Sequence, residues 1–460
     1  MTIRDLDYLK QEISKFIEEK DIKSLKNLLC ELDDVETLFV MNEVTNREKV
    51  IVFRLLSKDS AHLTFEQLDT SIQKELLESF TDEYAKEIVE ELAPDDRVQL
   101  FEELPPSVVS RLIKSLSVEE RKITNMLMGY EPETAGRIMT PEFIALNRDM
   151  TADEALQKVR VQAKDKETIY TLYVTGDKKK LEGVVSLKML LTAEPEEKIE
   201  DIMIDSVIMA WTDTDREEAA KKLKDYDLLA IPVVDREGCI VGIITIDDAL
   251  DILEQEATED IYDHAGLADI TGKETNRSEV LVRGSVWAIW KVRLPFLVIT
   301  LVAGLAAGLI IDGFEETLEY IGVAVAIFIP VIMDMGGNVG TQSTTVFVRG
   351  VVLGHIEMKT FWRHLLKEVL VGASIGLIVG VITGIIGGVW QGMPMLGLAV
   401  GLSLFVTMTL AAFLGFLVPY ILIKLKADQA AGAAPIITSI KDIVGLIIYF
   451  VLVTAFMGLM

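Results

Sequence analysis

The chain has 460 residues, 50% of them hydrophobic, and its 45 Lys and Arg against 72 Asp and Glu give a formal net charge of −27. Residues 283–460 hold 10 basic and 9 acidic side chains, so 35 basic and 63 acidic ones lie in residues 1–282. This excess of acid excludes binding to nucleic acid phosphates, which needs clustered Lys and Arg. Two distant cysteines, Cys30 and Cys239, exclude a disulfide framework and a CxxC metal motif.

Residues 1–132 are expected to form an acidic, all-α superhelical domain. Leu or Phe recurs every 12 residues, at positions 56, 68, 80, 92, 104 and 116, and in most copies Ser, Asp or Thr follows. This pattern predicts helices of about nine residues joined by tight turns. Residues 1–16 lack the apolar core of a signal peptide, so we expect this part to stay in the cytosol. Its acidic surface is either a docking surface or a solvated scaffold.

An internal repeat occupies residues 133–255, with copies at 138–195 and 199–255. Ile138-Met139 recurs as Ile202-Met203, and Gly183–Ser186 recurs as Gly242–Thr245. Each copy predicts strand, helix, strand, turn, strand, helix. This α/β region resembles a tandem CBS pair, a module that commonly binds adenine nucleotides and dimerises. The CBS pattern has an Asp three residues after the Ser or Thr, where it meets a ribose; the second copy has Asp248 there, whereas the first departs from the pattern with Met189.

The segment between the repeat and the membrane part, residues 256–282, is expected to be an acidic connecting helix. Asp248 and Asp251 lie upstream of this segment and Glu259 lies within it. They are spaced by three and eight residues, so one helix face carries all three. Like charges so arranged repel, and divalent cations between domains would relieve the repulsion. The alternative is a solvated helix face.

Five apolar stretches in residues 283–460 are long enough to cross a bilayer, near 294–312, 320–347, 368–390, 395–423 and 432–459. Basic residues precede the first span, separate spans two and three, and follow span four, whereas the other two connections have none. The positive-inside rule then places the N-terminus in the cytoplasm and the C-terminus outside. Because five spans are few for a pore, we expect a homodimer with its path on or near the two-fold axis.

Polar residues inside spans two and five indicate an ion path. Pro330, three glycines and Asn338 predict irregular backbone in span two, which is tolerated only where it lines a cavity or is buried in protein. An intramembrane acid such as Asp442 marks an ion path by default. The alternative for Asp442 is a neutralising pair with Lys441, which we disfavour because adjacent helical residues do not face each other. Asp334 suits a packing role as well as a metal role, and Asp428 suits a solvated helix end.

Span three has glycines at 372, 376, 380, 384 and 388, and shorter pairs occur at 304 and 308 and at 397 and 401. We interpret these faces as sites of close helix packing rather than as the lining of a path.

An oxygen-only site of this kind selects a hard cation, because the spans hold no histidine or cysteine ligand cluster. Mg²⁺, Ca²⁺ and Mn²⁺ remain. Two Asp442 carboxylates facing each other across a two-fold axis, with carbonyls nearby, would suit a largely hydrated Mg²⁺.

The whole chain, from acidic helical domain through CBS pair and connecting helix to five spans, resembles the MgtE family of magnesium channels and transporters. The motifs that carry the resemblance are Pro330…Gly337-Asn338-Val-Gly340-Thr-Gln342, Asp428…Pro435…Thr438…Asp442-Ile-Val-Gly445 and Glu256-Ala-Thr-Glu259-Asp260-Ile261. The resemblance implies a homodimeric plasma-membrane protein for magnesium uptake, not an enzyme and without catalytic residues. It also implies a pore site centred on Asp442 and supported by Asn338, Gly337, Thr438 and Asp428.

The resemblance further implies a cytosolic Mg²⁺ sensor, whose positions match Glu217, Asp227, Asp248, Asp251, Glu256, Glu259 and Asp260, together with Asp95 and Asp96 of the helical domain. Mg²⁺ bound between the domains would bridge carboxylates and hold the pore closed, and repulsion would separate the domains when cytosolic Mg²⁺ falls. Expected partners are Mg²⁺, membrane lipid, a second copy of the chain and an adenine nucleotide such as ATP. The alternatives are a CBS-regulated exchanger of divalent cations and a non-transporting membrane sensor of nucleotides.

Overall fold

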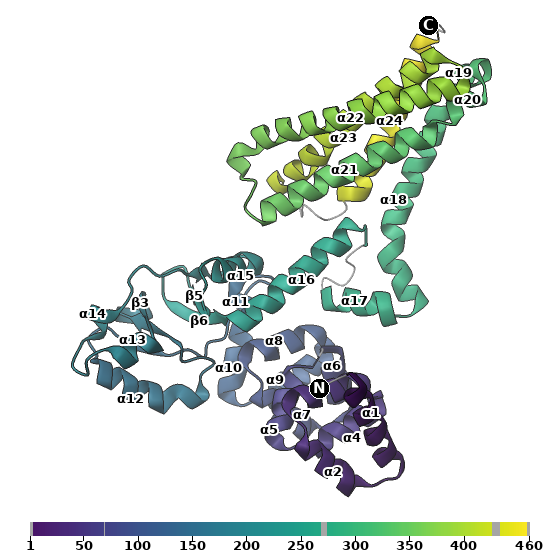
Figure 1. Ribbon diagram of the computed structural model, residues 1–460. Coiled ribbons are helices and arrows are strands. Elements are labelled where there is room, and N and C mark those ends of the chain that lie inside the picture. Colours follow the sequence, from purple (N-terminus) through teal and green to yellow (C-terminus); the bar gives the residue numbers. More distant parts are fainter. Residues whose placement is uncertain (1–2, 69, 268–273, 426–432, 458–460) are drawn as a thin grey trace. The chain divides into compact units, whose positions relative to one another are not determined.

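The computed structural model describes residues 3–68, 70–267, 274–425 and 433–457 of the chain. It divides into two compact units, residues 1–253 and 254–460, which are described separately below. Unit 1 comprises the acidic helical domain and the repeat. Unit 2 comprises the membrane helices (Figure 1).

Unit 1 begins with an array of short helices in which each turn is defined by local capping. Asp33 and Glu36 form a capping box at the start of α3, as Thr45 and Glu48 do at the start of α4. The helices are α1 (Ile3–Glu18), α2 (Ile22–Glu31), α3 (Asp34–Glu43), α4 (Asn46–Leu55), α5 (Lys58–Glu66), α6 (Thr70–Ser79), α7 (Asp82–Glu91), α8 (Pro94–Glu103), α9 (Pro106–Ser115) and α10 (Val118–Leu127).

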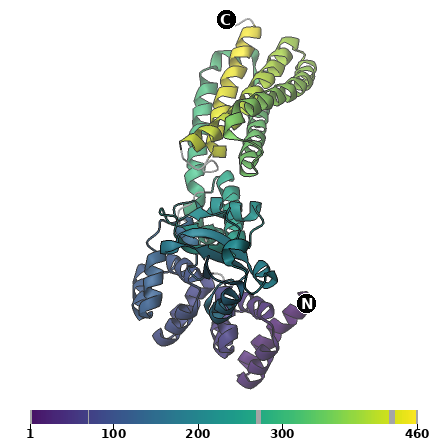
Figure 2. The same ribbon diagram turned by 90° about the vertical axis from the view of Figure 1, so that its left-hand side faces the viewer.

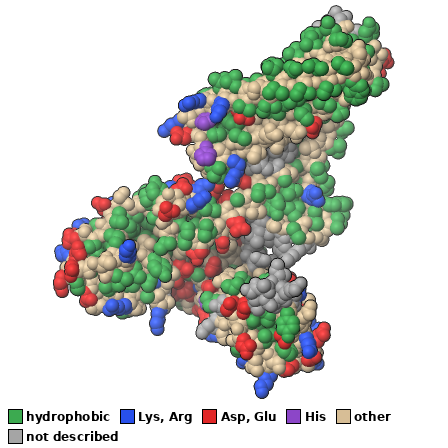
Figure 3. Space-filling model, viewed as in Figure 1, with side chains coloured by type: hydrophobic (Ala, Val, Ile, Leu, Met, Phe, Trp, Pro, Cys, Tyr) green, Lys and Arg blue, Asp and Glu red, His purple; other side chains and the backbone are tan. Residues whose placement is uncertain are grey.

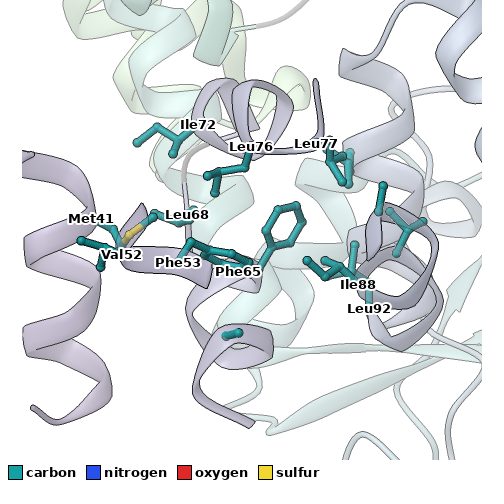
Figure 4. Packing of buried hydrophobic residues seen from close by; sticks show 14 of the residues in the cluster. Met41, Val52, Phe53, Phe65, Leu68, Ile72, Leu76, Leu77, Ile88 and Leu92 are labelled. Carbon is teal, nitrogen blue, oxygen red and sulfur yellow. The ribbon is translucent and has the colours of Figure 1, made fainter. Parts of the chain in front are cut away.

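The 12-residue repeat is confirmed and has a simple cause. A helix of about ten residues and a short turn make up each period, and the recurring apolar residue lies one or two residues after the helix. Leu56, Leu92, Leu104 and Leu116 are C-cap residues of α4, α7, α8 and α9. These caps turn inward, and the array packs around Phe53 and Phe65, which are both fully buried (Figure 4).

The repeat in unit 1 contains two three-stranded sheets of the same topology. In the first copy β1 (Ala145–Asn147) pairs parallel with β2 (Thr171–Thr175), and β2 pairs antiparallel with β3 (Leu181–Ser186). In the second copy β4 (Ala210–Trp211), β5 (Ala230–Val234) and β6 (Ile240–Thr245) repeat this order. The helices are α11 (Ala135–Ile138), α12 (Ala152–Gln162), α13 (Leu187–Thr192), α14 (Ile199–Ile202), α15 (Arg216–Asp225) and α16 (Ile246–His264).

The predicted element order is confirmed in both copies. Strand β5 is buried along its whole length and β6 along nearly all of it. This burial explains why polar residues do not alternate with apolar ones in these two strands.

The helical array packs against the second copy of the repeat within unit 1. Val98 of α8 and Leu127 of α10 share one apolar cluster with Ile231 of β5 and Ala249 of α16. Arg137 Nε lies 2.6 Å from Glu102 Oε1, which ties α11 to the end of α8. The first turn of α8 is therefore held beside the start of α16.

Unit 2 begins with residues 254–264 of α16 and continues with α17 (Glu274–Arg283), α18 (Val286–Asp312), α19 (Glu315–Ile321), α20 (Val323–Ala326), α21 (Ile329–Val352), α22 (Phe361–Gln391), α23 (Pro394–Lys424) and α24 (Ala433–Phe456). Five spans, 286–312, 323–352, 358–391, 394–424 and 438–456, are long and apolar enough to cross a membrane, as predicted. Helices α21 to α24 run alongside one another in both views (Figures 1 and 2). Hydrophobic side chains cover their outer surface, whereas Asp and Glu gather over unit 1 (Figure 3).

The prediction of irregular backbone in span two is wrong at Gly336, Gly337 and Gly340. The backbone is irregular only upstream of these three glycines. Helix α21 is continuous from 329 to 352 and has Pro330 in its first turn, where the missing N–H costs nothing. The chain breaks instead at Gly322, whose φ of +81° ends α19, and Tyr449 of α24 donates to the Val325 carbonyl at 2.8 Å in the short helix that follows.

The glycines of α21 to α24 serve close packing, as interpreted for span three. A Cβ at Gly380 would clash with the Gly401 carbonyl, and one at Gly384 would lie 2.8 Å from the Gly397 carbonyl. The pair in α18 differs: nothing lies within 4 Å of a Cβ at Gly304 or Gly308.

Candidate cation path and acidic cluster

The exposed face of α21 is polar along a membrane span. Its members recur every three or four residues and so line one side of the helix: Asp334, Asn338, Thr341, Gln342 and Thr345. Asn338 Nδ2 donates to Asp334 Oδ2 at 3.2 Å, so the amide of Asn338 is oriented by the carboxylate one turn earlier. A polar face at this depth is costly against lipid, which indicates that it borders water or protein in the assembled molecule.

The two charged residues of α24 have different surroundings. Lys441 is 3% exposed, and its Nζ lies 3.1 Å from the Gly337 carbonyl oxygen of α21. Asp442 is half-buried, and its Oδ1 has no hydrogen-bond partner among the described residues. The alternative of a Lys441–Asp442 ion pair is therefore wrong in the described structure, because the lysine turns toward α21. The carboxylate remains available to a ligand.

The other predicted pore positions are partly brought together. A Cβ at Gly337 would lie 4.0 Å from Thr438 Cγ2, so this turn of α21 faces the turn of α24 that precedes Asp442. Asn338 lies on the exposed side of the same turn of α21. Asp428 falls outside the described residues.

The donors available at this junction are a carboxylate, an amide, hydroxyls and backbone carbonyls, which suit a hard cation. Within the described part of the chain, no group of three or more His, Cys, Asp or Glu is placed to hold a metal ion.

Unit 1 holds the second candidate site, an acidic cluster at the first turn of α8. Asp95 and Asp96 follow Pro94, the first residue of α8, and the dipole of that helix favours carboxylates there. Arg97 fixes this turn: it is 1% exposed and donates to the carbonyls of Val89 and Leu92 at the end of α7. One buried atom, Asp95 Oδ1, has no hydrogen-bond partner among the described residues.

The cluster continues into the repeat. Asp248 lies in the first turn of α16, where Thr245 Oγ1 donates to its Oδ2 at 2.5 Å. Burial, followed by the nearby Asp248 carboxylate, raises the pKa of Asp96 to about 7 and raises that of Asp95 well above its usual range. Burial also raises the pKa of Asp248 to about 6, although its bond with Thr245 opposes the change. These carboxyl groups repel one another unless protons or cations lie between them.

Sequence reasoning missed one prominent member of the cluster, Glu167, which lies in the loop before β2. Partial burial and then the Asp248 carboxylate raise its pKa to about 7. Its backbone N–H donates to the Glu142 carbonyl at 3.1 Å, and Glu142, Glu66 and Asp247 add further negative charge. Its closeness to Asp96 and Asp248 arises from the tertiary fold of unit 1, so no local pattern could have identified it.

The remaining sensor candidates lie apart from this cluster or make other contacts. Glu217 pairs with Lys221 at 2.6 Å in the first turn of α15, and Asp227 follows the same helix with a φ of +52°. Asp251 lies one turn beyond Asp248 on α16. The other three candidates, Glu256, Glu259 and Asp260, lie on the part of α16 that belongs to unit 2.

The end of α16 is joined to α17 by a buried ion pair within unit 2. Arg277 Nη1 lies 2.6 Å from Asp263 Oδ1 and 2.9 Å from the Leu267 carbonyl, and both charged side chains are nearly inaccessible. Tyr262 lies under the guanidinium and donates to Ser278 at 3.1 Å. These contacts connect α16 firmly to the helix that leads into the first span.

Comparison with known families matches three regions of the chain. Residues 329–452 match a family described as divalent cation transporter, MgtE; residues 32–133 match the MgtE intracellular N domain; residues 135–196 and 199–255 each match a CBS domain.

Two curated relatives span nearly the whole chain. The magnesium transporter MgtE of Thermus thermophilus is 35% identical and covers 96% of this chain and 97% of its own length. The magnesium transporter MgtE of Bacillus subtilis is 33% identical and covers 98% of each. A crystal structure of the cytosolic domain of the Mg²⁺ channel MgtE in complex with ATP is 36% identical, with a TM-score of 0.50, and covers 53% of this chain and 99% of that one.

Proposed function

Because the chain belongs to the MgtE family and is a multi-pass membrane transporter of Mg²⁺, we propose that it is a Mg²⁺-selective channel for uptake across the plasma membrane, closed by cytosolic Mg²⁺. The observation that carries the proposal is the meeting of α21 and α24: a polar, exposed helix face beside Asp442, whose carboxylate retains an unpartnered oxygen. A membrane anchor for a sensor would need neither feature.

Two copies of the chain complete the proposed path. One chain supplies a single Asp442 at this junction, with Asn338, Gly337 and Thr438 in supporting positions, and the resemblance of the motif adds Asp428. A second copy related by a two-fold axis would bring a second carboxylate to the ion and cover the polar face of α21. Mg²⁺ gives up its water reluctantly, so an ion held by two carboxylates and a few amide or carbonyl oxygens keeps most of its hydration shell.

The acidic cluster of unit 1 is the centre of the proposed sensor. Asp95, Asp96 and Asp248, joined by Glu167, combine raised pKa values with a buried, unpartnered oxygen on Asp95. Mg²⁺ bound there replaces protons and relieves repulsion, which holds α8 against α16. By their motif or position we add these residues to the sensor: Glu217, Asp227, Asp251, Glu256, Glu259 and Asp260.

Two further assignments belong to the same proposal. Basic residues in the connections place the N-terminus in the cytoplasm and the C-terminus outside. An adenine nucleotide such as ATP binds the CBS pair, with Asp248 of the second copy at the ribose; the ATP complex of the solved cytosolic domain supports this assignment.

Two measurements test the proposal. Expression should restore growth at low Mg²⁺ to a bacterium deficient in Mg²⁺ transport. Purified protein in planar bilayers should pass a current whose reversal potential follows the Mg²⁺ gradient alone. A reversal potential that shifts with a Na⁺ or proton gradient would indicate an exchanger instead.

A further inference from the structure

The buried amine of Lys441 is the least expected feature of the membrane unit. It lies on α24, 104 residues from Gly337 in sequence, and reaches the Gly337 carbonyl oxygen of α21 at 3.1 Å. Lysine is among the residues least often buried, because losing water is costly to an ammonium group. An ammonium held inside a membrane span therefore needs a reason for its position.

Gly340 makes the space for this side chain. The three atoms nearest to a Cβ built at Gly340 all belong to Lys441: Nζ would clash with it, and Cδ would lie 2.6 Å away. On the other side, the Gly340 carbonyl lies against Gly415 of α23, where a Cβ would approach it to 2.6 Å. Lys441 thus occupies a notch, defined here as the gap over Gly340, in which the Gly337 carbonyl one turn earlier accepts a hydrogen bond from its amine.

The amine is held away from its neighbour in sequence but remains in its electrostatic field. Asp442 Oδ1 has no hydrogen-bond partner among the described residues, and the two charged groups interact electrostatically. A second acid in the same unit, Asp334, lies on the exposed face of α21 and accepts from Asn338. The notch therefore fixes a positive charge behind the one half-buried carboxylate of α24.

We propose that Lys441 is a positioning residue that weakens the hold of Asp442 on Mg²⁺ and so lets the ion leave. The proposal rests on the proposed function, because it assigns a role at the same path. Conduction requires an ion to bind favourably enough to enter and weakly enough to leave. Two facing Asp442 carboxylates alone would hold a divalent cation tightly, and a fixed ammonium beside each one reduces that attraction.

The test is Mg²⁺ uptake into Mg²⁺-free proteoliposomes, measured against external Mg²⁺ for the full chain and its variants. Lys441→Met keeps the length and apolar stem but removes the charge. We expect the half-saturating Mg²⁺ concentration to fall about tenfold, as loss of one nearby unit charge predicts, and the maximal rate to fall with it. Lys359→Met, at an exposed lysine between α21 and α22, is the matched control and should change neither value.

Lys441→Gln separates charge from packing. It keeps an N–H donor for the Gly337 carbonyl, so helix packing is retained while the charge is lost, and we expect the same fall in half-saturation as for Lys441→Met. A wild-type half-saturation in Lys441→Gln would overturn the proposal and leave only a packing role. An unchanged or raised half-saturation in Lys441→Met, in a variant that elutes and melts as the wild type, would also overturn it.

Gly340→Ala checks the notch independently. The added methyl group must displace the amine, so half-saturation should shift as in Lys441→Met, whereas in the Lys441→Ala background the same methyl should have no further effect. If Gly340→Ala shifted the half-saturating Mg²⁺ concentration equally in both backgrounds, the methyl group would not be acting through Lys441. A wild-type protein that transports no Mg²⁺ would refute the proposed function itself. Normal transport by the wild type, together with any of the contradicting results named for the variants, would refute only the role of Lys441.

Discussion

The two units treat negative charge in opposite ways. Unit 1 gathers carboxylates from three separate places in the chain, Asp95 and Asp96, Glu167, and Asp248, and the charges that raise their pKa values belong to other carboxylates. Unit 2 places a buried lysine next to Asp442, the acid of α24. A cluster of like charges responds strongly to the concentration of a divalent ion, whereas a single acid with a compensating charge releases the ion readily. The difference matches the two proposed roles, sensing in unit 1 and passage in unit 2.

The largest effect on Mg²⁺ uptake is expected from neutralising Asp442. Asp442→Asn should abolish Mg²⁺ uptake into proteoliposomes, because the amide keeps the size of the side chain and removes its charge. Asp312→Asn, which neutralises an exposed acid at the end of α18 in the same way, is the matched control and should retain most of the flux. Normal uptake by Asp442→Asn in a correctly folded protein would remove the distinction between the two units.

Removing the helical array should relax regulation without stopping transport. Deletion of residues 1–130 takes Asp95 and Asp96 from the cluster, so Mg²⁺ can no longer join α8 to α16. We expect channel current that persists at cytosolic Mg²⁺ concentrations that close the intact protein. Mg²⁺ inhibition equal to that of the full chain would exclude the helical array from gating.

The pH dependence of packing between α8 and the repeat tests whether the carboxylates of the cluster repel one another as strongly as their raised pKa values indicate. Asp96 and Glu167 have pKa values of about 7 in the folded chain, above the ordinary values of 3.8 and 4.5, so the folded state binds more protons between those limits. Without Mg²⁺, packing of α8 on the repeat should therefore weaken as pH rises from about 5 to 8. Limited proteolysis should show Mg²⁺ protection that is larger at pH 8 than at pH 6.

Equal protection by Mg²⁺ at both pH values would mean that the cluster is not where the ion binds. Protection lost at both values in Asp96→Asn would support the assignment.

The smallest effect is expected from a single change at the edge of the cluster. Glu167→Gln removes one partly exposed negative charge that attracts Mg²⁺, so more Mg²⁺ should be needed for half-maximal protection against proteolysis, by about two- to threefold given solvent screening. Glu196→Gln, at an exposed acid elsewhere in the first CBS copy, should leave the required concentration unchanged. An unchanged or lower requirement in Glu167→Gln would exclude Glu167 from the cluster that binds the ion.

Much of the fold could be predicted because its signals are local. Capping residues and a recurring leucine define each short helix of the array, and the length of an apolar run defines each span. The strands of the repeat follow from short apolar segments between turns. The one clear error, irregular backbone at Gly336–Gly340, arose because glycine permits a break without requiring one; here those residues let α23 and α24 approach a regular helix.

The sequence by itself determined the division into an acidic helical and CBS part and a nearly neutral part with five spans, and it led to the proposal of Asp442 for the ion path. The tertiary structure alone decided that Lys441 turns to Gly337 rather than to Asp442, that Glu167 joins Asp95 and Asp248, and that span two breaks at Gly322. Each of these depends on groups far apart in the chain, and the cost of burying a charge or a carbonyl is met only by the partner that packing brings within reach.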